Sequence, residues 1–527
     1  MKRPRSIDPL FFVAKVLGVV AVLAGVSLGA PAVRAETVPP DSWVYEALRS
    51  FELRGLVALE PTLPYTFDQC EKYVKEIVAR IDRERVELGP RHRFLIERLT
   101  KQFVGLRDTP EGRWSSPTGV YRQDERYFAM DFKVGGTLQR KPDEEKGEMD
   151  GLAVTDFLVG FGHNVTMETS YRLVVAPERG SNTGGYKPSA RLKSYRGLTA
   201  QFERGLIDAG GSWWSVRAGR EYLHWGNYLA EDLILARTAG SLDHVGARFE
   251  LGRFALSTFQ AILDAASQRH LAGHRLTVAL PRGIFLGVSE TVLYKRNLDF
   301  KYVLPLSIFY AQQYSEGTNA DNILWSLDWK VPVHRGLSIC GELLVDDLQY
   351  ERDEAAGPDR LGAYITADAL FMVAGREIEA SCGYFYVDVY TYAHGDGTQY
   401  VAGDGNLTMN RMLGLTYRGP DSDRWFAKAV IGMSARSSLG LECGRSRYGG
   451  SGSLLHYLRD WVPGMDNDPH FPSNPVMNVT YVIPNLRYDL NGGSYLSAGV
   501  WVRHRERNAD RVDDYDYMGW LELLLDL

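Results

Sequence analysis

From residue 127 onward, apolar and polar side chains alternate along many segments, and this period of two constrains the fold more than any other feature. In one such segment Trp325 and Leu327 lie on one face of the predicted strand, while Asp328 lies on the other. A soluble sandwich turns its apolar face inward. A membrane barrel turns the apolar face outward to lipid and keeps a polar lumen.

The connections between these segments favour the membrane barrel. Short turns such as Gly252-Arg253 alternate with long polar connections such as 297–321. Outer-membrane barrels have short turns on the periplasmic side and long loops outside. The pattern therefore predicts an all-β transmembrane barrel of about 18 antiparallel strands, with both ends of the chain in the periplasm. The predicted strands are 127–138, 152–162, 164–175, 195–205, 212–221, 242–251, 254–264, 274–281, 284–296, 322–331, 337–348, 361–373, 377–391, 408–418, 424–436, 475–489, 494–505 and 515–527.

The first 35 residues differ from the rest of the chain. A basic start and a long apolar run precede Val33-Arg34-Ala35, which presents small residues at the two positions that a signal peptidase reads. We therefore expect residues 1–35 to be a signal peptide that is cleaved before Glu36. An uncleaved anchor helix is the alternative, because the apolar run is long enough to span a membrane.

Charge and cysteine content argue against two classes of function. Removing residues 1–35 takes away five Lys or Arg and one Asp, which leaves 55 basic and 65 acidic side chains and a net charge of −10. A chain this acidic is not expected to bind nucleic acid. Four widely spaced cysteines without a CxxC motif predict neither a metal site nor a disulfide framework.

A region ahead of the first predicted strand has helical periodicity instead. Thr66 and Gln69 form a capping-box pair before an apolar stripe, and Asp41 is a candidate cap for an earlier helix. Amphipathic helices must bury their stripes, and these helices precede the barrel. We therefore predict a small periplasmic helical bundle at or partly within the barrel mouth, with domains at 36–120 (bundle) and 121–527 (barrel).

The segment after the strand at 212–221 concentrates polar and aromatic side chains, and its apolar residues suggest that 222–241 folds inward. An aromatic ring beside carboxylates, amides and a guanidinium is typical of a sugar site, where the ring stacks on C–H faces and the polar groups bind hydroxyls. A structural plug with internally paired charges explains the same composition equally well. The candidate residues for either role are Arg220, Glu221, His224, Trp225, Asn227, Tyr228, Glu231 and Asp232.

A second group of oxygen-bearing side chains lies on two neighbouring predicted strands. Such oxygens can bind Ca²⁺, but carboxylates in a lumen more often pair with arginines of neighbouring strands. We therefore expect no metal and no cofactor. The group consists of Asp321, Asn322, Asp328, Glu342, Asp346 and Asp347, of which Asp328, Glu342 and Asp346 face the lumen by alternation.

Catalysis is a weaker interpretation than binding. A nucleophilic enzyme needs a serine, a histidine and an orienting group within reach, and no serine-elbow motif accompanies the histidines. His274 and the pair Ser289-Glu290 lie on adjacent predicted strands, which keeps an outer-membrane hydrolase as one alternative.

Several short features together resemble the capsule-assembly family of outer-membrane lectins, the Wzi-like family. They are Leu48 to Val57, the run from Gly219-Arg220-Glu221 to Trp225-Gly226, Gly287 to Glu290, Asp321-Asn322, and Glu342 to Asp347. The resemblance implies an 18-stranded barrel with a blocked lumen, which holds capsular polysaccharide on the cell surface and is not an export channel. Two features depart from the family pattern, namely Leu527 at the position of a terminal aromatic residue and a predicted long loop at 437–474.

We therefore expect a monomeric, non-enzymatic outer-membrane protein that binds and attaches capsular or other surface polysaccharide. Outer-membrane lipid and lipopolysaccharide surround it, and nucleic acid is not a partner. A porin or export channel is the main alternative, because Arg172, Lys330 and Arg503 are expected to line a polar lumen.

Overall fold

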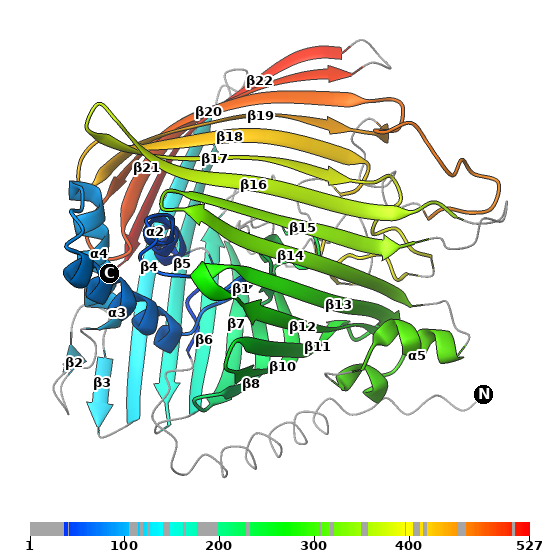
Figure 1. Ribbon diagram of the computed structural model, residues 1–527, viewed down its shortest axis with the longest axis horizontal. Coiled ribbons are helices and arrows are strands. Elements are labelled where there is room, and N and C mark those ends of the chain that lie inside the picture. The colour runs from blue at the N-terminus through cyan, green and yellow to red at the C-terminus, as the bar shows by residue number, and fades with distance from the viewer. Residues whose placement is uncertain are drawn as a thin grey trace.

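In the described part of the chain, eighteen long antiparallel strands close into a barrel, with β22 hydrogen-bonded to β4 (Figure 1). This computed structural model describes residues 36–40, 42–104, 114–115, 120–123, 126–140, 148–161, 165–175, 198–227, 232–304, 307–316, 321–348, 357–395, 397–403, 412–414, 419–450, 460–507 and 512–526. The barrel strands are β4 (Arg126–Arg140), β5 (Glu148–Gly160), β6 (Val165–Val175), β7 (Leu198–Gly210), β8 (Trp214–Tyr222), β10 (Ser241–Leu251), β11 (Phe254–Asp264), β12 (Arg269–Ala279), β13 (Phe285–Lys295), β14 (Asn322–His334), β15 (Leu337–Asp347), β16 (Arg360–Val373), β17 (Arg376–Val387), β18 (Ser422–Gly432), β19 (Ser437–Tyr448), β20 (Met477–Asp489), β21 (Tyr495–Arg507) and β22 (Val512–Asp526). The shorter strands are β1 (Thr62–Leu63), β2 (Trp114–Ser115), β3 (Val120–Gln123) and β9 (His224–Trp225).

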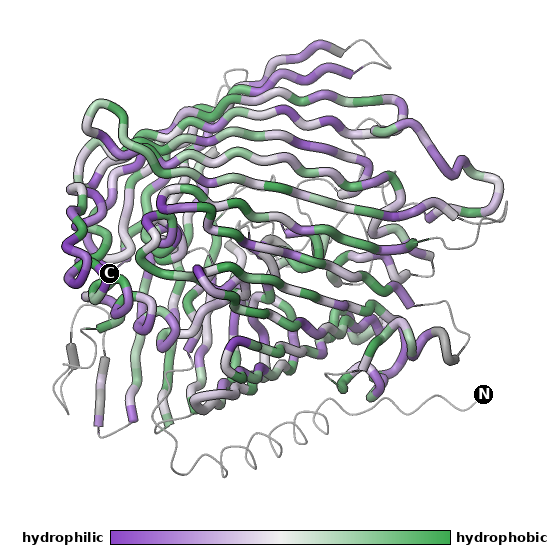
Figure 2. The backbone as a smooth tube through the Cα atoms, viewed as in Figure 1, coloured by the Kyte–Doolittle hydropathy of each residue, from purple (hydrophilic) through white to green (hydrophobic). Residues whose placement is uncertain are grey.

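The barrel wall has an apolar outer face and a polar inner face. On β14, Leu327 points outward and is 43% exposed, whereas Asp328 points inward and is 1% exposed. On β12, Leu276 is exposed on the outer face and Arg275 is buried inside. Figure 2 shows hydrophobic and hydrophilic positions alternating along the strands. An apolar outer face around a polar interior is the arrangement of a transmembrane barrel, as the alternation predicts.

Short turns gather at one end of the barrel and long connections at the other. Strands β12 and β13 join through the 3₁₀ turn η4 (Pro281–Gly283), and β16 joins β17 through Ala374 and Gly375. The described parts of the connections 296–321 and 449–476 lie at the opposite end. We refer below to the short-turn end and the long-loop end of the barrel.

One predicted strand is wrong. Strand β17 pairs directly with β18, from Ile378 opposite Ile431 to Val387 opposite Ser422, so the predicted strand at 408–418 has no place between them. Within that range Met412 and Leu413 are buried in the interior cluster, and residues 404–411 and 415–418 lie outside the described residues. Met412 and Leu413, two of the apolar side chains that suggested a strand, therefore fill the interior.

One strand is missing from the prediction, because Ser437–Tyr448 forms β19 and not the start of a long loop at 437–474. Glycine or serine occupies four of its six inward positions, so the alternation is weak in the sequence. At Gly444 a Cβ would lie 2.6 Å from the hydroxyl oxygen of Tyr481, which fills the space beside the glycine. The missed strand offsets the wrong one, and the predicted number of 18 is confirmed.

Three helices cover the short-turn end: α2 (Trp43–Leu53), α3 (Phe67–Glu84) and α4 (Pro90–Phe103) (Figure 1). Thr66 and Gln69 form the predicted capping box at the start of α3, with N···O distances of 3.2 and 2.8 Å. Ser42 caps α2 by accepting the N–H of Val44, and the predicted cap, Asp41, lies outside the described residues. No helix in the described residues is long and apolar enough to cross a membrane.

Ion pairs attach the bundle to the barrel. Lys330 of β14 lies 2.6 Å from the Glu52 carboxylate of α2, and Arg91 of α4 lies 3.3 Å from Asp489 at the end of β20. The helices bury their apolar stripes against one another, with Leu48, Phe51, Val74, Ile77 and Leu99 fully buried. The bundle is therefore part of the closed end of the barrel and does not stand apart from it.

His92 of α4 is buried at this attachment. Its ring is 1% exposed, with one nitrogen 2.6 Å from the Ser50 hydroxyl and the other 2.5 Å from the Glu377 carboxylate. Burial, and then the positive charges of Arg54 and Arg91, lower the pKa of His92 to about 3. The folded state therefore holds a neutral imidazole at neutral pH.

We expect His92 to remove stability as the pH falls. An unfolded histidine has a pKa of about 6.5, so below that pH the unfolded chain binds a proton that the folded chain does not. The free energy of unfolding should fall by about 2 kcal/mol between pH 7 and pH 5 and continue to fall towards pH 3. Urea titrations of the refolded barrel measure this, and His92→Gln should show a shallower loss. An equal pH dependence in both proteins would contradict the prediction.

Candidate functional site

The described residues between β8 and β10 lie inside the barrel. Its short strand β9 pairs antiparallel with β1 from the N-terminal region, with Thr62 opposite Trp225 and Leu63 opposite His224. Leu233 to Ala236 are 0% exposed. Of the predicted inward loop, the described residues 223–227 and 232–240 thus belong to the interior, whereas Tyr222 and Ser241 are wall residues at the ends of β8 and β10. Two of the predicted site residues, Tyr228 and Glu231, lie outside the described residues.

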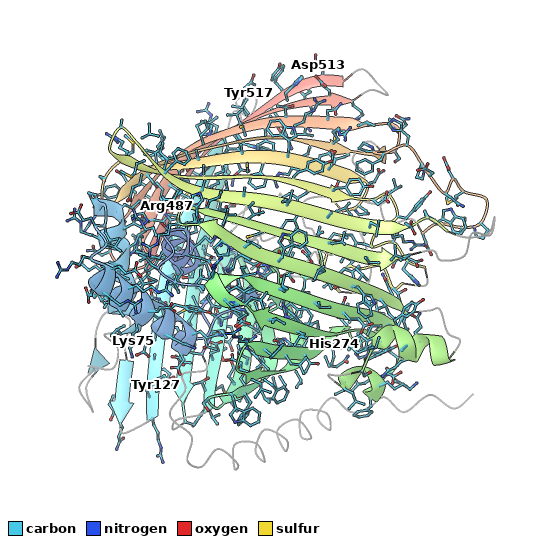
Figure 3. The ribbon with its side chains drawn as sticks, in the orientation of Figure 1. Lys75, Tyr127, His274, Arg487, Asp513 and Tyr517 are labelled. Atoms are coloured by element: carbon cyan, nitrogen blue, oxygen red, sulfur yellow. The ribbon has the colours of Figure 1, made fainter. Side chains whose placement is uncertain are left out.

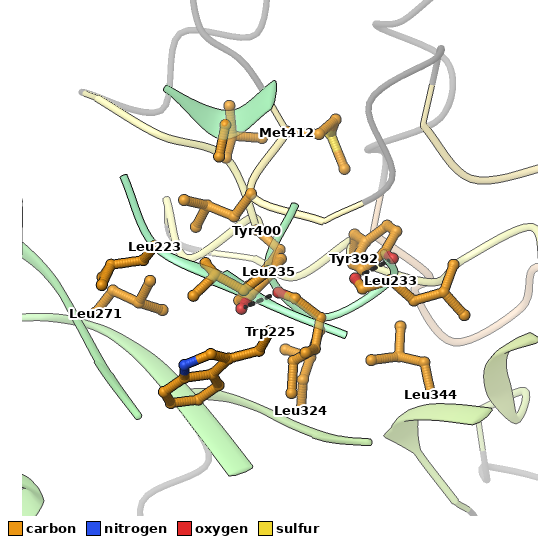
Figure 4. Close-up of a cluster of buried hydrophobic side chains, with 14 of the residues drawn as sticks. Leu223, Trp225, Leu233, Leu235, Leu271, Leu324, Leu344, Tyr392, Tyr400 and Met412 are labelled. Atoms are coloured by element: carbon orange, nitrogen blue, oxygen red, sulfur yellow. Dashed lines mark hydrogen bonds between the residues drawn. The ribbon is translucent and has the colours of Figure 1, made fainter. Parts of the chain in front are cut away.

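The backbone of Leu233 and Ile234 has a side-chain partner for each polar group. The two N–H groups donate to the Glu342 carboxylate over 2.7 and 3.1 Å. The two carbonyls accept the hydroxyls of Tyr392 and Tyr400 over 2.6 and 2.7 Å (dashed lines in Figure 4). An irregular segment inside a barrel has no strand to pair with, so its backbone needs such partners. Glu342, Tyr392 and Tyr400 therefore fix this stretch across the interior.

Asp232 fixes the same segment one residue earlier. Its buried carboxylate accepts the Tyr364 hydroxyl over 2.7 Å and the backbone N–H of Asn227 over 3.1 Å, and it contacts a ring nitrogen of His224. Gly226 has a φ of 146°, and a Cβ there would lie 2.0 Å from Asp232 Oδ1. A side chain at position 226 would therefore displace the carboxylate that organises the turn.

Trp225 is part of the packed interior. Its ring is 3% exposed and meets the Phe259 ring edge-on, with centroids 5.1 Å apart. Leu235 and Leu271 belong to the same apolar cluster (Figure 4). An indole enclosed in this way offers no free face to a sugar ring, so the geometry favours the plug over sugar stacking for this residue.

Arg220 and Glu221 are neighbours in sequence but lie on opposite faces of the wall. Glu221 is 0% exposed inside the barrel, where it accepts Arg204 Nε over 2.9 Å and the hydroxyl of Thr37. Arg220 lies on the outer face and forms two 2.7 Å hydrogen bonds to Asp243. Strand alternation therefore separates Arg220 from the interior candidates.

The predicted lumen carboxylates do not gather at one point. Asp328 pairs with Arg275 over 2.5 and 3.0 Å and accepts the Asn227 side chain over 2.9 Å. Asp346 accepts the backbone N–H of Tyr392 over 2.7 Å. Among the described residues, no group of three or more His, Cys, Asp or Glu side chains is placed to hold a metal ion. Protein donors thus occupy these carboxylate oxygens.

The remaining members of that group lie at the long-loop end. Asn322 points inward and donates to the carbonyl of Thr398 over 3.0 Å. Asp321 accepts the Tyr302 hydroxyl over 2.7 Å, from the connection that follows β13. Asp347 ends β15 beside a register shift in its pairing with β16. The two neighbouring residues Asp321 and Asn322 therefore hold different loops.

Three residues that hold the interior together are absent from the sequence-based prediction: Arg269, Tyr392 and Tyr400. Arg269 is 0% exposed, and its guanidinium donates to four backbone carbonyls within residues 397–403, over 2.5 to 3.1 Å. The chain between β17 and β18 therefore enters the barrel from the long-loop end. The tyrosine-rich run at 390–400 is the signal that could have found it.

Residues 59–63 enter the interior from the short-turn end. Arg248 Nη2 lies 2.6 Å from both carboxylate oxygens of Glu60, and the Gly226 N–H donates to the carbonyl of Pro61 over 3.2 Å. Segments from the two ends therefore meet within the barrel.

His274 and Ser289 cannot form a nucleophile and base pair, because the wall separates them. His274 faces outward, with Nε2 3.1 Å from Glu290 Oε2. Ser289 faces inward and accepts Arg275 Nη1 over 2.9 Å. Their strands are adjacent, as predicted, but a shared proton would have to cross the wall.

No protein-family model matches the chain, and no curated protein matches its sequence. Among solved structures it is similar to Wzi of Escherichia coli, described as an outer-membrane protein involved in group 1 capsule assembly and a carbohydrate-binding β-barrel, with a TM-score of 0.61, 12% identity and coverage of 94% of this chain and 100% of that chain. OccD3 (OpdP) of Pseudomonas aeruginosa aligns with a TM-score of 0.45 at 9% identity, over 79% of this chain and 95% of its own. A BenF-like porin of Pseudomonas fluorescens aligns with a TM-score of 0.43 at 9% identity, over 76% and 99%. Of these three, only the likeness to Wzi has a TM-score above 0.5, and it confirms the resemblance to the Wzi-like family as a likeness of fold.

Proposed function

We propose that this protein is a non-enzymatic, lectin-like barrel of the outer membrane that binds capsular or other surface polysaccharide and attaches it to the cell surface. The filled interior carries the proposal, because segments 59–63, 232–241 and 388–403 meet there with buried side chains and partnered backbone groups. A barrel filled in this way is unsuited to solute diffusion. The fold likeness to a carbohydrate-binding barrel supports the same class of function.

The inward basic residues that motivated a porin have acidic partners. The pairs are Arg172–Glu203, Lys330–Glu52 and Arg503–Asp516. Basic side chains that attract anions into a pore need to be free of such partners. The pairing therefore favours a binding protein over a channel.

On this proposal the short-turn end and its helices face the periplasm, and the long-loop end faces the outside of the cell. The protein is a monomer, and its long-loop end is the surface that binds the glycan. The described long-loop residues include aromatic side chains, among them Phe471, whose ring lies 4.5 Å from that of Tyr386, and the half-buried Trp461. Aromatic rings on exposed loops are suited to the C–H faces of sugars.

Two measurements on the reconstituted barrel test the proposal. Planar bilayers should show almost no conductance for the wild type, and immobilised protein should retain acidic surface polysaccharide from a capsulated strain. Trp461→Ala should weaken retention, whereas Trp213→Ala, a 58% exposed tryptophan at the short-turn end, should not. An open wild-type channel would favour transport and end the lectin proposal. Closed barrels that retain no polysaccharide would also end it.

We also propose that the mature chain begins at Glu36. Glu36 is 1% exposed, its carbonyl accepts the Phe67 N–H over 2.8 Å, and its carboxylate accepts the Tyr127 hydroxyl over 3.0 Å. These contacts make Glu36 part of the folded protein, which supports a mature chain that starts at this residue. Intact-mass measurement of the protein extracted from outer membranes should therefore match 36–527. A mass that includes residues 1–35 would mean an uncleaved anchor.

A further inference from the structure

The connection between β13 and β14 folds back over the outside of the barrel wall. We call its described residues, 296–304 and 307–316, the outer segment; it contains the 3₁₀ turn η5 (Phe300–Val303) and helix α5 (Phe309–Glu316). Figure 1 shows α5 outside the wall, at the long-loop end of β13. Tyr302 is 3% and Phe309 is 0% exposed, because both are packed against the wall.

The wall beneath the outer segment is covered although it faces outward. Val292 on β13 is 0% exposed, whereas Val288, four residues along the same face, is 44% exposed. On β14, Ile323 is 7% exposed and Leu327, on the same face, is 43% exposed. The outer segment therefore covers the outer face of β13 and β14 near the long-loop end, where these strands would otherwise be exposed.

Polar groups on the outer wall explain why this part of the barrel needs a cover. Glu290 faces outward, is 1% exposed, and accepts the backbone N–H groups of Phe309 and Tyr310 over 2.9 and 3.0 Å. His274 lies beside it (labelled in Figure 3), with its ring centroid 4.5 Å from that of Phe309. A carboxylate facing hydrocarbon is costly unless hydrogen-bonded and enclosed. The start of α5 provides both the donors and the enclosure.

Side-chain contacts hold the outer segment in place. Arg296 pairs with Asp299 over 3.0 Å and with Asp321 over 2.5 Å, and the Tyr302 hydroxyl donates to Asp321 over 2.7 Å. The Tyr294 hydroxyl, on the outer wall, accepts Gln260 Nε2 over 2.8 Å. The outer segment is thus a folded part of the wall.

The exposed side chains of the outer segment are mostly apolar, with Lys301 also exposed among them. The large apolar side chains on it are Phe300 (73% exposed), Val303 (39%), Leu304 (61%), Ile308 (54%) and Tyr310 (50%). Exposed apolar side chains grouped this closely mark a surface that contacts something other than water. The same strands present exposed apolar residues below the segment, so this face continues the lipid-facing wall.

We propose that the outer segment is embedded in the outer leaflet of the membrane, with Leu304 and Ile308 in contact with lipid hydrocarbon. It acts as a short amphipathic anchor that shields Glu290 and His274 from lipid and widens the apolar belt of the barrel on one side. Tyr310 lies in the segment as an amphipathic ring suited to the membrane interface. The inference rests on the membrane location in the proposed function but not on polysaccharide binding.

Spin labels at one accessible cysteine test this location, in the full-length barrel reconstituted in lipid. Cys382 and Cys443 are replaced by alanine, and the buried Cys70 and Cys340 are kept. Ile308→Cys is the test position, Leu276→Cys on the lipid-facing wall is the hydrocarbon control, and Val462→Cys, 51% exposed at the long-loop end, is the water control. Collision with oxygen reports hydrocarbon, and collision with a neutral nickel chelate reports water. We expect the Ile308 label to match the Leu276 label, with several-fold more oxygen than nickel contact relative to the Val462 label.

Two results would overturn the inference. A label at Ile308 that matches Val462 would place the outer segment in water. An immobile label that neither reagent reaches would mean that a protein surface, such as a second copy of the chain, covers it. If the Leu276 label also behaved as in water, the membrane location itself would be wrong, and the proposed function would fail separately from the outer segment.

Discussion

Replacing Glu342 by leucine should release the interior segment at 232–236 and open the barrel. Leucine removes the acceptor for the N–H groups of Leu233 and Ile234, which donate to no other acceptor among the described residues. Leaving a buried donor unpaired costs about 1–3 kcal/mol, so the two together weaken attachment of the segment by about 2–6 kcal/mol. We expect frequent conductance steps where the wild type is silent, and a lower unfolding temperature in gel-shift assays of the heat-modifiable barrel.

Two variants at the same place make the measurement specific. Glu342→Gln keeps one acceptor oxygen and should be intermediate in both assays. Leu343→Val changes the next residue, which is 42% exposed on the outer face, and should behave as the wild type. A Glu342→Leu barrel as silent and as stable as the wild type would show that this carboxylate does not hold the interior segment.

Replacing Arg269 by alanine should free residues 397–403 from the interior. The four carbonyls that accept hydrogen bonds from the guanidinium would lose a charged donor. Each bond that water does not replace lowers the stability of the folded loop by about 1.5–3 kcal/mol. Chymotrypsin added to intact cells should then cut after Tyr400, which is 0% exposed in the intact fold. Cleavage is read as two barrel fragments on a denaturing gel.

Two control variants test whether the expected cleavage depends on the guanidinium group of Arg269 and not on its positive charge alone. Arg269→Lys keeps the charge but offers a single ammonium in place of a planar fork, so it should be cut at an intermediate rate. Arg253→Ala removes an exposed arginine from a turn at the opposite end and should leave the protein resistant. Equal resistance of all three variants would mean that other contacts hold the loop.

The strand pattern could be predicted because each wall residue has one of two environments, lipid or interior. Alternation at Trp325, Leu327 and Asp328 reports that difference directly. Prediction from alternation fails where side chains of loops, and not those of the wall strands, fill the interior. The inward position 444 of β19 is a glycine, which leaves space for Tyr481. Met412 and Leu413 are apolar because they fill the lumen.

The candidate site could be predicted only as a region. The unusual composition at 220–232 indicates interior residues. Strand alternation could have predicted that Arg220 and Glu221 lie on opposite faces of the wall. The partners of those residues come from distant strands and loops, as with Glu342, Tyr392 and Arg269, and nothing in the local sequence specifies such pairings. The burial of Trp225 likewise depends on Phe259, on another strand.

The N-terminal contacts also set an order of assembly. Arg49 bonds to Asp368, 319 positions later, and Arg91 bonds to Asp489, 398 positions later. A chain that enters the periplasm amino end first therefore presents its helices long before their partners exist. Contacts this remote in sequence form late, since closing such loops costs entropy before any contact repays it. Until the last strands have formed, the apolar stripes of α2, α3 and α4 can pack only against one another. The helices can therefore cover the short-turn end only after the barrel wall has formed.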